Sequence, residues 1–165
     1  QGRNYGLMNS GRKYSLLEAK TKLEALCAYQ ERCSQELDRK MRTWGLDQED
    51  RDALLADLIT HNFLSEERFA EAFVSGKVNI KRWGKIKIRQ HLKQKAISDY
   101  SIKKALEGIE DEVYFGNLRR LTEHKYGTLK GPDDYNKKVK LYRYLSGKGY
   151  ETEYVREVVE EVVNS

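Results

Sequence analysis

"TWGLDQED" (residues 43–50), "QKAISDYS" (94–101) and "GKGYETEY" (147–154) are three short stretches that decide how this chain folds. Each contains one apolar anchor, which is Leu46, Ile97 or Tyr150, and the anchors follow one another at nearly constant spacing. Self-similarity at a period of this size is typical of proteins built from repeated supersecondary units. The spacing therefore predicts three copies of one unit.

Apolar residues stand at fixed distances from every anchor. Those before it are i, i+4 neighbours on one helix, and those after it form the apolar stripe of the next helix. The pattern breaks once, at Arg51, where the other copies have Ile102 and Val155. One compact bundle with accidental periodicity is the alternative, and the six shared positions disfavour it. The shared residues, besides the anchors, are Leu37, Ile88, Leu141, Met41, Leu92, Leu145, Leu54, Ala105, Val158, Leu55, Leu106, Val159, Leu58, Ile109 and Val162.

The turns also contain residues that begin helices. Asp47 and Ser98 are expected N-caps, because their side chains can accept the free N–H groups of the following helix. In the third turn Glu151 or Thr152 must serve, which is a weaker signal. Each copy therefore contains a helix–turn–helix pair.

A longer helix is expected before each pair, over residues 16–32, 65–81 and 111–125. Ser65 is the expected N-cap of the second. Its core-facing seam is predicted at Phe69, Phe73, Gly76 and Ile80, with the glycine allowing close approach to a neighbour.

The predicted fold is all-α, with nine helices in three tandem three-helix, helix–turn–helix-like repeats that form an elongated, curved array. The repeats are assigned to residues 14–61, 62–109 and 110–165. Residues 1–13 lack periodicity, and we expect a flexible N-terminal tail or an expression remnant there.

The composition limits the possible environments and partners. There are 31 Lys and Arg residues against 26 Asp and Glu residues, and the net charge of +5 favours an anionic partner. Cys27 and Cys33 are too few for a disulfide scaffold, and Cys27 is expected to point inward as a small hydrophobe. Because the sequence shows neither a membrane-spanning run nor a signal-peptide pattern, we expect a cytoplasmic protein that does not contact membranes.

No arrangement of residues points to catalysis. His61, His91 and His124 are scattered, and the two "SGK" stretches at 75–77 and 146–148 do not belong to a phosphate-binding loop. We predict no catalytic residue, no metal site and no cofactor.

A basic segment lies at residues 72–98, which contain no carboxylate. Solvated helices usually mix charges of both signs, so this pattern indicates a binding surface. Within it, Lys85, Arg89 and Lys93 form one helical stripe. The basic residues are Lys77, Lys81, Arg82, Lys85, Lys87, Arg89, Lys93 and Lys95.

Two features accompany this segment. Trp83 either plugs the corner between two helices, which we favour, or stacks on a base or a partner side chain. Gly84 is expected to give the chain freedom to turn. A smaller basic group, with Tyr142 and Tyr144 interleaved, occurs in the third repeat, and we expect both groups to form one continuous strip. Its members are Lys137, Lys138, Lys140 and Arg143.

The chain resembles the RecX regulatory proteins, which modulate the RecA recombinase. The resemblance covers roughly residues 14–163 and is strongest in "FLSEERFAEAFV" (63–74) and "RWGKIKIRQHLKQKAI" (82–97). "GLDQEDRDALLADL" (45–58) and "GKGYETEYVREVVEEV" (147–162) also look like turns of this family. Many relatives have a proline where Lys85 stands and a carboxylate where His91 stands, so this chain is the more basic.

The resemblance implies a non-enzymatic regulator that acts as a monomer. Proteins of this kind lodge in the groove of the RecA–DNA filament, with single- or double-stranded DNA inside it. They reduce ATP hydrolysis, strand exchange and assisted repressor cleavage, and so modulate recombination, DNA repair and the SOS response. The basic residues above, with Trp83 and Tyr142, are then the expected contacts.

Two other functions stay open. A stand-alone DNA-binding protein would use its helix–turn–helix pairs, but the second helices begin with "DQED", "SDYS" and "ETEY", which are acidic or neutral. Base readers normally place Arg, Asn or Gln there. A generic helical scaffold leaves the carboxylate-free segment unexplained.

Overall fold

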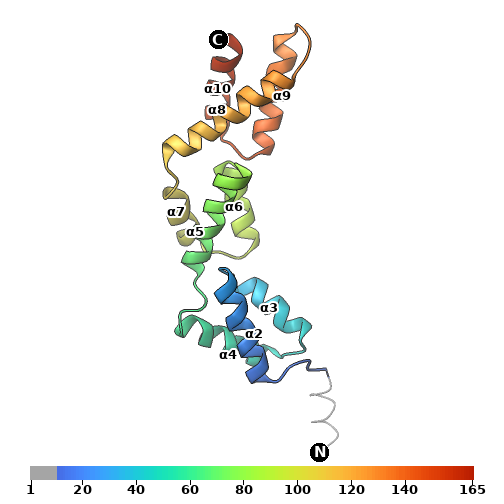
Figure 1. Cartoon of the computed structure of the whole chain (residues 1–165), viewed down its shortest axis with the longest axis vertical. Coiled ribbons are helices and arrows are strands. Elements are labelled where there is room, and N and C mark those ends of the chain that lie inside the picture. The colour runs from blue at the N-terminus through green and yellow to red at the C-terminus, as the bar shows by residue number, and fades with distance from the viewer. Residues whose placement is uncertain (1–10) are drawn as a thin grey trace, which may run out of the picture. The chain divides into compact units, whose positions relative to one another are not determined.

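The computed structural model describes residues 11–165, and this part of the chain is helical without strands (Figure 1). The predicted all-α helical-repeat fold is confirmed. Of the predicted tail, residues 1–10 lie outside the described residues. The helices are α2 (Leu16–Tyr29), α3 (Ser34–Thr43), α4 (Gln48–Thr60), α5 (Glu66–Gly76), the π-helix η1 (Lys77–Lys81), α6 (Lys85–Gln94), α7 (Asp99–Glu107), α8 (Asp111–Thr128), α9 (Asp134–Gly147) and α10 (Thr152–Asn164).

The chain divides into two compact units. The first extends to Phe69 and includes Lys95–Ile97, and the second consists of Ala70–Gln94 and Ser98–Ser165. Within residues 11–165, no helix combines the length and apolar character needed to cross a membrane. The boundaries of the three sequence repeats stay a prediction.

Each unit contains an apolar core. In the first unit Cys27 points inward as predicted, and burial raises the pKa of its thiol. The first core is formed by Ala19, Leu23, Cys27, Leu37, Met41, Leu46, Leu54, Leu58 and Leu64. The second is formed by Tyr114, Leu118, Leu121, Leu141, Leu145, Tyr150, Val155, Val158, Val159, Val162 and Val163.

The repeated apolar positions are core positions. All three anchors are buried, and so are the residues nine and five positions before them. Leu55 and Ile109 are only partly buried, and both pack against a core. The prediction that the periodicity marks the core is confirmed.

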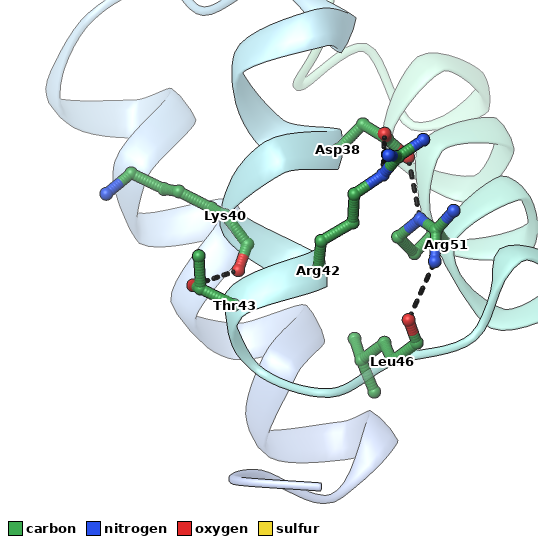
Figure 2. A network of polar contacts seen from close by, with 6 residues as sticks. All are labelled: Asp38, Lys40, Arg42, Thr43, Leu46 and Arg51. Carbon is green, nitrogen blue, oxygen red and sulfur yellow. Dashed lines mark hydrogen bonds and ion pairs between the residues drawn. The ribbon is translucent and has the colours of Figure 1, made fainter. Parts of the chain in front are cut away.

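Arg51, the exception to the pattern, is held by polar partners (Figure 2). Its Nε donates to Asp38 Oδ1 at 2.8 Å, and its Nη1 donates to the carbonyl oxygen of the anchor Leu46, also at 2.8 Å. Arg42 Nε donates to the other oxygen of Asp38 at 3.0 Å. The Arg51 side chain is only 12% exposed, so the first repeat ties its turn with an ion pair where the others use apolar packing.

The predicted N-caps are confirmed. Asp47 and Ser98 accept hydrogen bonds from the backbone N–H groups of Asp50 and Ser101, and Ser65 accepts from Arg68. In the third turn Glu151 is the N-cap residue of α10 but makes no side-chain capping bond. Its carboxylate accepts a hydrogen bond from the Tyr114 hydroxyl instead.

The ends of the longer helices differ from prediction. The first ends at Tyr29 rather than at residue 32, because the chain becomes extended at Gln30. The Arg32 side chain folds back there, with Nε donating to the Leu26 carbonyl oxygen. The third continues to Thr128, and the second changes from α to π geometry after Gly76.

The predicted seam of the second helix is wrong. The buried residues are Ala70, Val74 and Val78, which form an i, i+4, i+8 stripe on one face of the helix. Ile80 is 78% exposed, and a Cβ on Gly76 would meet nothing within 4 Å.

A left-handed residue precedes every anchor. Gly45, Ala96 and Gly149 have φ of 78°, 60° and 96°. This conformation closes each turn, and it costs a residue with a side chain about 1–2 kcal/mol. Ala96 alone among the three bears that cost.

Replacing Ala96 by glycine should therefore raise the free energy of unfolding by about 1 kcal/mol. Ala25→Gly is the matched control, since Ala25 is exposed inside α2, and it should lower that free energy by a similar amount. Urea denaturation measures both. Destabilisation by Ala96→Gly would contradict the assignment of strain to this turn.

Candidate functional site

The Trp83 corner, residues 77–84, begins with the π-helix η1. After η1 the chain turns at Arg82, which is left-handed at φ 56° and ψ 44°. The N–H groups of Arg82 and Trp83 both donate to the carbonyl oxygen of Lys77. Short π-helical turns are frequent at functional sites, and a left-handed arginine persists only where its surroundings fix it.

The surroundings that fix the corner come from the turn between α9 and α10. The Gly84 N–H donates to the Lys148 carbonyl oxygen at 2.8 Å, and the Ile86 N–H donates to that of Gly149 at 3.0 Å. The Tyr150 hydroxyl donates to the Arg82 carbonyl oxygen at 2.8 Å.

Gly84 is needed for close approach, and the prediction that it frees the chain to turn is wrong. A Cβ at Gly84 would lie 2.3 Å from the carbonyl atoms of Gly149, and one at Gly149 would lie 2.3 Å from Lys87 Cβ. We call this the Gly84–Gly149 contact. The turning residue is Arg82, whose φ is positive.

Two polar side chains of α8 bind the same region. The Tyr114 hydroxyl accepts from the Lys85 N–H at 2.8 Å and donates to Glu151. Burial, with that bond to Glu151, raises the pKa of Tyr114, so the phenol stays protonated. Asn117 Nδ2 donates to the Val78 carbonyl oxygen at 2.9 Å. Sequence reasoning missed these residues, and the only available signal was a polar side chain on a buried helix face.

Cationic side chains surround Trp83. The ammonium nitrogens of Lys77 and Lys87 lie 4.7 and 4.4 Å from the centre of the indole ring. The His91 ring lies 4.5 Å away, measured between ring centroids. Trp83 is half-buried, and these contacts suit a tryptophan that packs the corner and holds two lysines over it.

The stripe on α6 is unevenly exposed. The Lys85 ammonium lies 4.9 Å from the centre of the Tyr114 ring, and Lys85 is half-buried. Arg89 and Lys93 are exposed. Lys93 Nζ lies 3.9 Å from Asp99 Oδ1, and such a long, exposed ion pair contributes little.

The basic group on α9 separates into engaged and exposed members. Lys138 Nζ donates to Glu160 at 3.0 Å, and this bond lowers the pKa of Glu160. Lys137 lies over the Tyr126 ring, and Tyr142 packs against the second core. The remaining two, Lys140 and Arg143, are exposed.

The structure thus brings together some of the predicted basic residues. Lys77 and Lys87 meet at Trp83, next to the exposed Lys81 and Arg82. Lys95 falls in the first compact unit. A continuous strip joining α6 and α9 stays a prediction. In residues 11–165, no cluster of three or more His, Cys, Asp and Glu side chains is arranged to hold a metal ion.

Comparisons with known proteins identify the family. Residues 65–106 match the model described as RecX, second three-helix domain, and residues 112–159 match RecX, third three-helix domain. The regulatory protein RecX of Chlorobaculum tepidum is 32% identical over 156 residues, which are 94% of this chain and 93% of that protein. The chain belongs to the RecX family.

Other RecX proteins agree with this assignment. The regulatory protein RecX of Clostridium botulinum strain Alaska E43 is 35% identical over 76% of this chain, and the match spans 59% of that longer relative. The crystal structure of RecX from Lactobacillus salivarius shares the fold with a TM-score of 0.80 at 20% identity. It covers 91% of this chain and 97% of its own.

The Gly84–Gly149 contact makes a prediction about two glycines. Gly84→Ala should lower the free energy of unfolding by about 3 kcal/mol, because its Cβ would strike the Gly149 backbone. Gly76→Ala should raise it by about 0.5–1 kcal/mol, since Gly76 is helical and its Cβ would meet open space. Urea denaturation of both variants gives the comparison. Equal effects of the two substitutions would contradict the close approach at Gly84.

Proposed function

We propose that this RecX-family chain is a non-enzymatic regulator that binds the RecA–DNA filament and limits RecA activity. The single observation that carries the proposal is family membership, since the relatives are named regulatory proteins. RecA is the partner that the resemblance to the RecX regulatory proteins implies. The activities limited would be ATP hydrolysis, strand exchange and assisted repressor cleavage, and through them recombination, DNA repair and the SOS response.

The charges suit a composite target of DNA and protein. Lys81, Arg82 and Arg89 are exposed in a segment without carboxylates, and Lys140 and Arg143 are exposed on α9. Cations in such positions attract phosphates and acidic side chains and speed the encounter with them. A filament groove offers both kinds of group.

The rigidity of the corner supports binding to an ordered partner. Tyr150 and the Gly84–Gly149 contact fix the backbone around Arg82, so less conformational entropy is lost when a partner binds. A regulator seated between neighbouring RecA subunits in this way would obstruct the movements that ATP hydrolysis and strand exchange require. The proposed regulator acts as a monomer.

Stand-alone reading of duplex DNA is the weaker candidate. The helices that would enter the groove, α4, α7 and α10, begin with carboxylates, and Asp47 already caps α4. Carboxylates at these ends would face phosphates unfavourably. The acidic helix starts therefore favour the filament as target.

The proposal is tested by DNA-stimulated ATP hydrolysis of the cognate RecA with this protein titrated in. The double variant Arg89→Gln/Lys93→Gln should require about tenfold more protein for half-inhibition, since two cations that neutralise phosphates are lost. The matched control Arg39→Gln/Arg156→Gln removes two exposed charges outside both basic groups and should inhibit like wild type.

Two outcomes would count against this account. Absence of inhibition by the wild-type protein would contradict the proposed function. Wild-type inhibition that the Arg89/Lys93 variant reproduces at equal concentration would leave the function in place and remove these two residues from it.

A further inference from the structure

Repeats two and three carry the same three-residue pattern in their middle helices, at the start of α6 and one turn into α9. Lys85–Lys87 reads Lys–Ile–Lys and Lys138–Lys140 reads Lys–Val–Lys, each at the same distance before its anchor, Ile97 or Tyr150. The equivalent residues of repeat one, 34–36, read Ser–Gln–Glu. We call the two patterns the triads, and both lie in the second compact unit.

The central residue of each triad is apolar and exposed. Ile86 is 39% exposed and Val139 is 37% exposed, whereas Ile88 and Leu141, two positions further along, are buried. The core requires the later pair, and the earlier pair projects from another face of each helix. One turn before Val139, Tyr135 is 74% exposed, which extends the apolar surface on α9.

The two lysines of each triad differ in the side chains that they contact. The first packs inward, with Lys85 over the Tyr114 ring and Lys138 paired with Glu160. The second has no carboxylate partner among residues 11–165: Lys87 lies over Trp83, and Lys140 is exposed. Each triad thus presents a branched apolar side chain beside a cation that no protein carboxylate neutralises.

We propose that the triads are two equivalent docking sites for an acidic protein surface with an apolar socket, displayed repeatedly by a polymeric partner. The inference rests on the proposed function, in which that polymer is the RecA filament. The unneutralised lysines complement carboxylates, and the exposed Ile and Val side chains gain free energy only where a socket removes them from water. A phosphate backbone offers the charge without the socket.

The presence of two sites in one compact unit favours a repeating partner. When one triad is bound, the other triad is held close to further binding sites on the same polymer. Those sites are then present at a high effective concentration. Two weak contacts then give tight binding to a filament and weak binding to a single subunit. Repeat one, with Gln35 and Glu36 in these places, would not contribute such a contact.

The test replaces each central residue by the residue of repeat one. Ile86→Gln and Val139→Gln keep every charge and introduce the side chain that Gln35 already places at this helix position. Binding is measured to RecA filaments assembled on fluorescent single-stranded DNA, and separately to the same DNA without RecA. Ile59→Gln, at an exposed position of α4, is the control, and circular dichroism verifies the helical content of every variant.

Each substitution should weaken filament binding about tenfold, and the double variant about a hundredfold, because each removes an apolar side chain that the socket would shield from water. Binding to bare DNA should change less than about twofold, since no charge is altered.

The contrary outcomes are separable. Wild-type filament binding that neither variant weakens would overturn the triads as docking sites and leave the proposed function intact. Equal weakening on bare DNA would make the triads a nucleic-acid surface and also overturn the inference. Failure of the wild-type protein to bind the filament would overturn the proposed function together with the inference.

Discussion

The contact between the backbones of Gly84 and Gly149 is the constraint on which the candidate site depends. Two backbones can approach this closely only where neither residue carries a Cβ. The approach allows the turn before α10 to accept hydrogen bonds from the start of α6, and it brings the Tyr150 hydroxyl to the Arg82 carbonyl oxygen. The left-handed arginine and the two lysines over Trp83 are therefore held by a segment that lies far away in the sequence.

The periodic apolar residues made the fold predictable. Leu46, Ile97 and Tyr150 with their partners at fixed spacing report directly on which helix faces are buried, and the structure buries them. Side-chain caps were predictable for the same local reason, since Asp47 and Ser98 act on their own helices. Local chemistry and regular spacing are readable from a single sequence.

Features that depend on distant partners were not predictable. The change to π geometry at Lys77 leaves no mark in composition, and the carbonyl oxygen of Val78 is bound by Asn117 from α8. The sequence predicts close approach at Gly76, whereas the structure has it at Gly84. A sequence alone does not distinguish a glycine that allows close approach from a helical glycine that faces open space. Packing partners decide that difference.

The candidate site was predictable in part. The absence of carboxylates between residues 72 and 98 correctly indicates a basic segment, but partners outside a segment change which charges stay available. Glu160 engages Lys138, and Tyr114 lies under Lys85. The exposure of Ile86 and Val139 was not predictable, because an apolar residue between two lysines can face either the core or solvent.

The salt dependence of binding distinguishes a protein that recognises RecA-coated DNA as a composite surface from one that binds DNA alone. Affinity is measured for one fluorescent single-stranded DNA, bare and RecA-coated, from about 50 to about 200 mM salt. We expect binding to coated DNA to persist at salt concentrations that abolish binding to bare DNA. If about five phosphates are neutralised, the logarithm of the bare-DNA affinity should fall with the logarithm of the salt concentration at a slope of about −3.5. If the affinities for the two forms fall together with one slope, the protein does not recognise a composite surface and instead binds DNA alone.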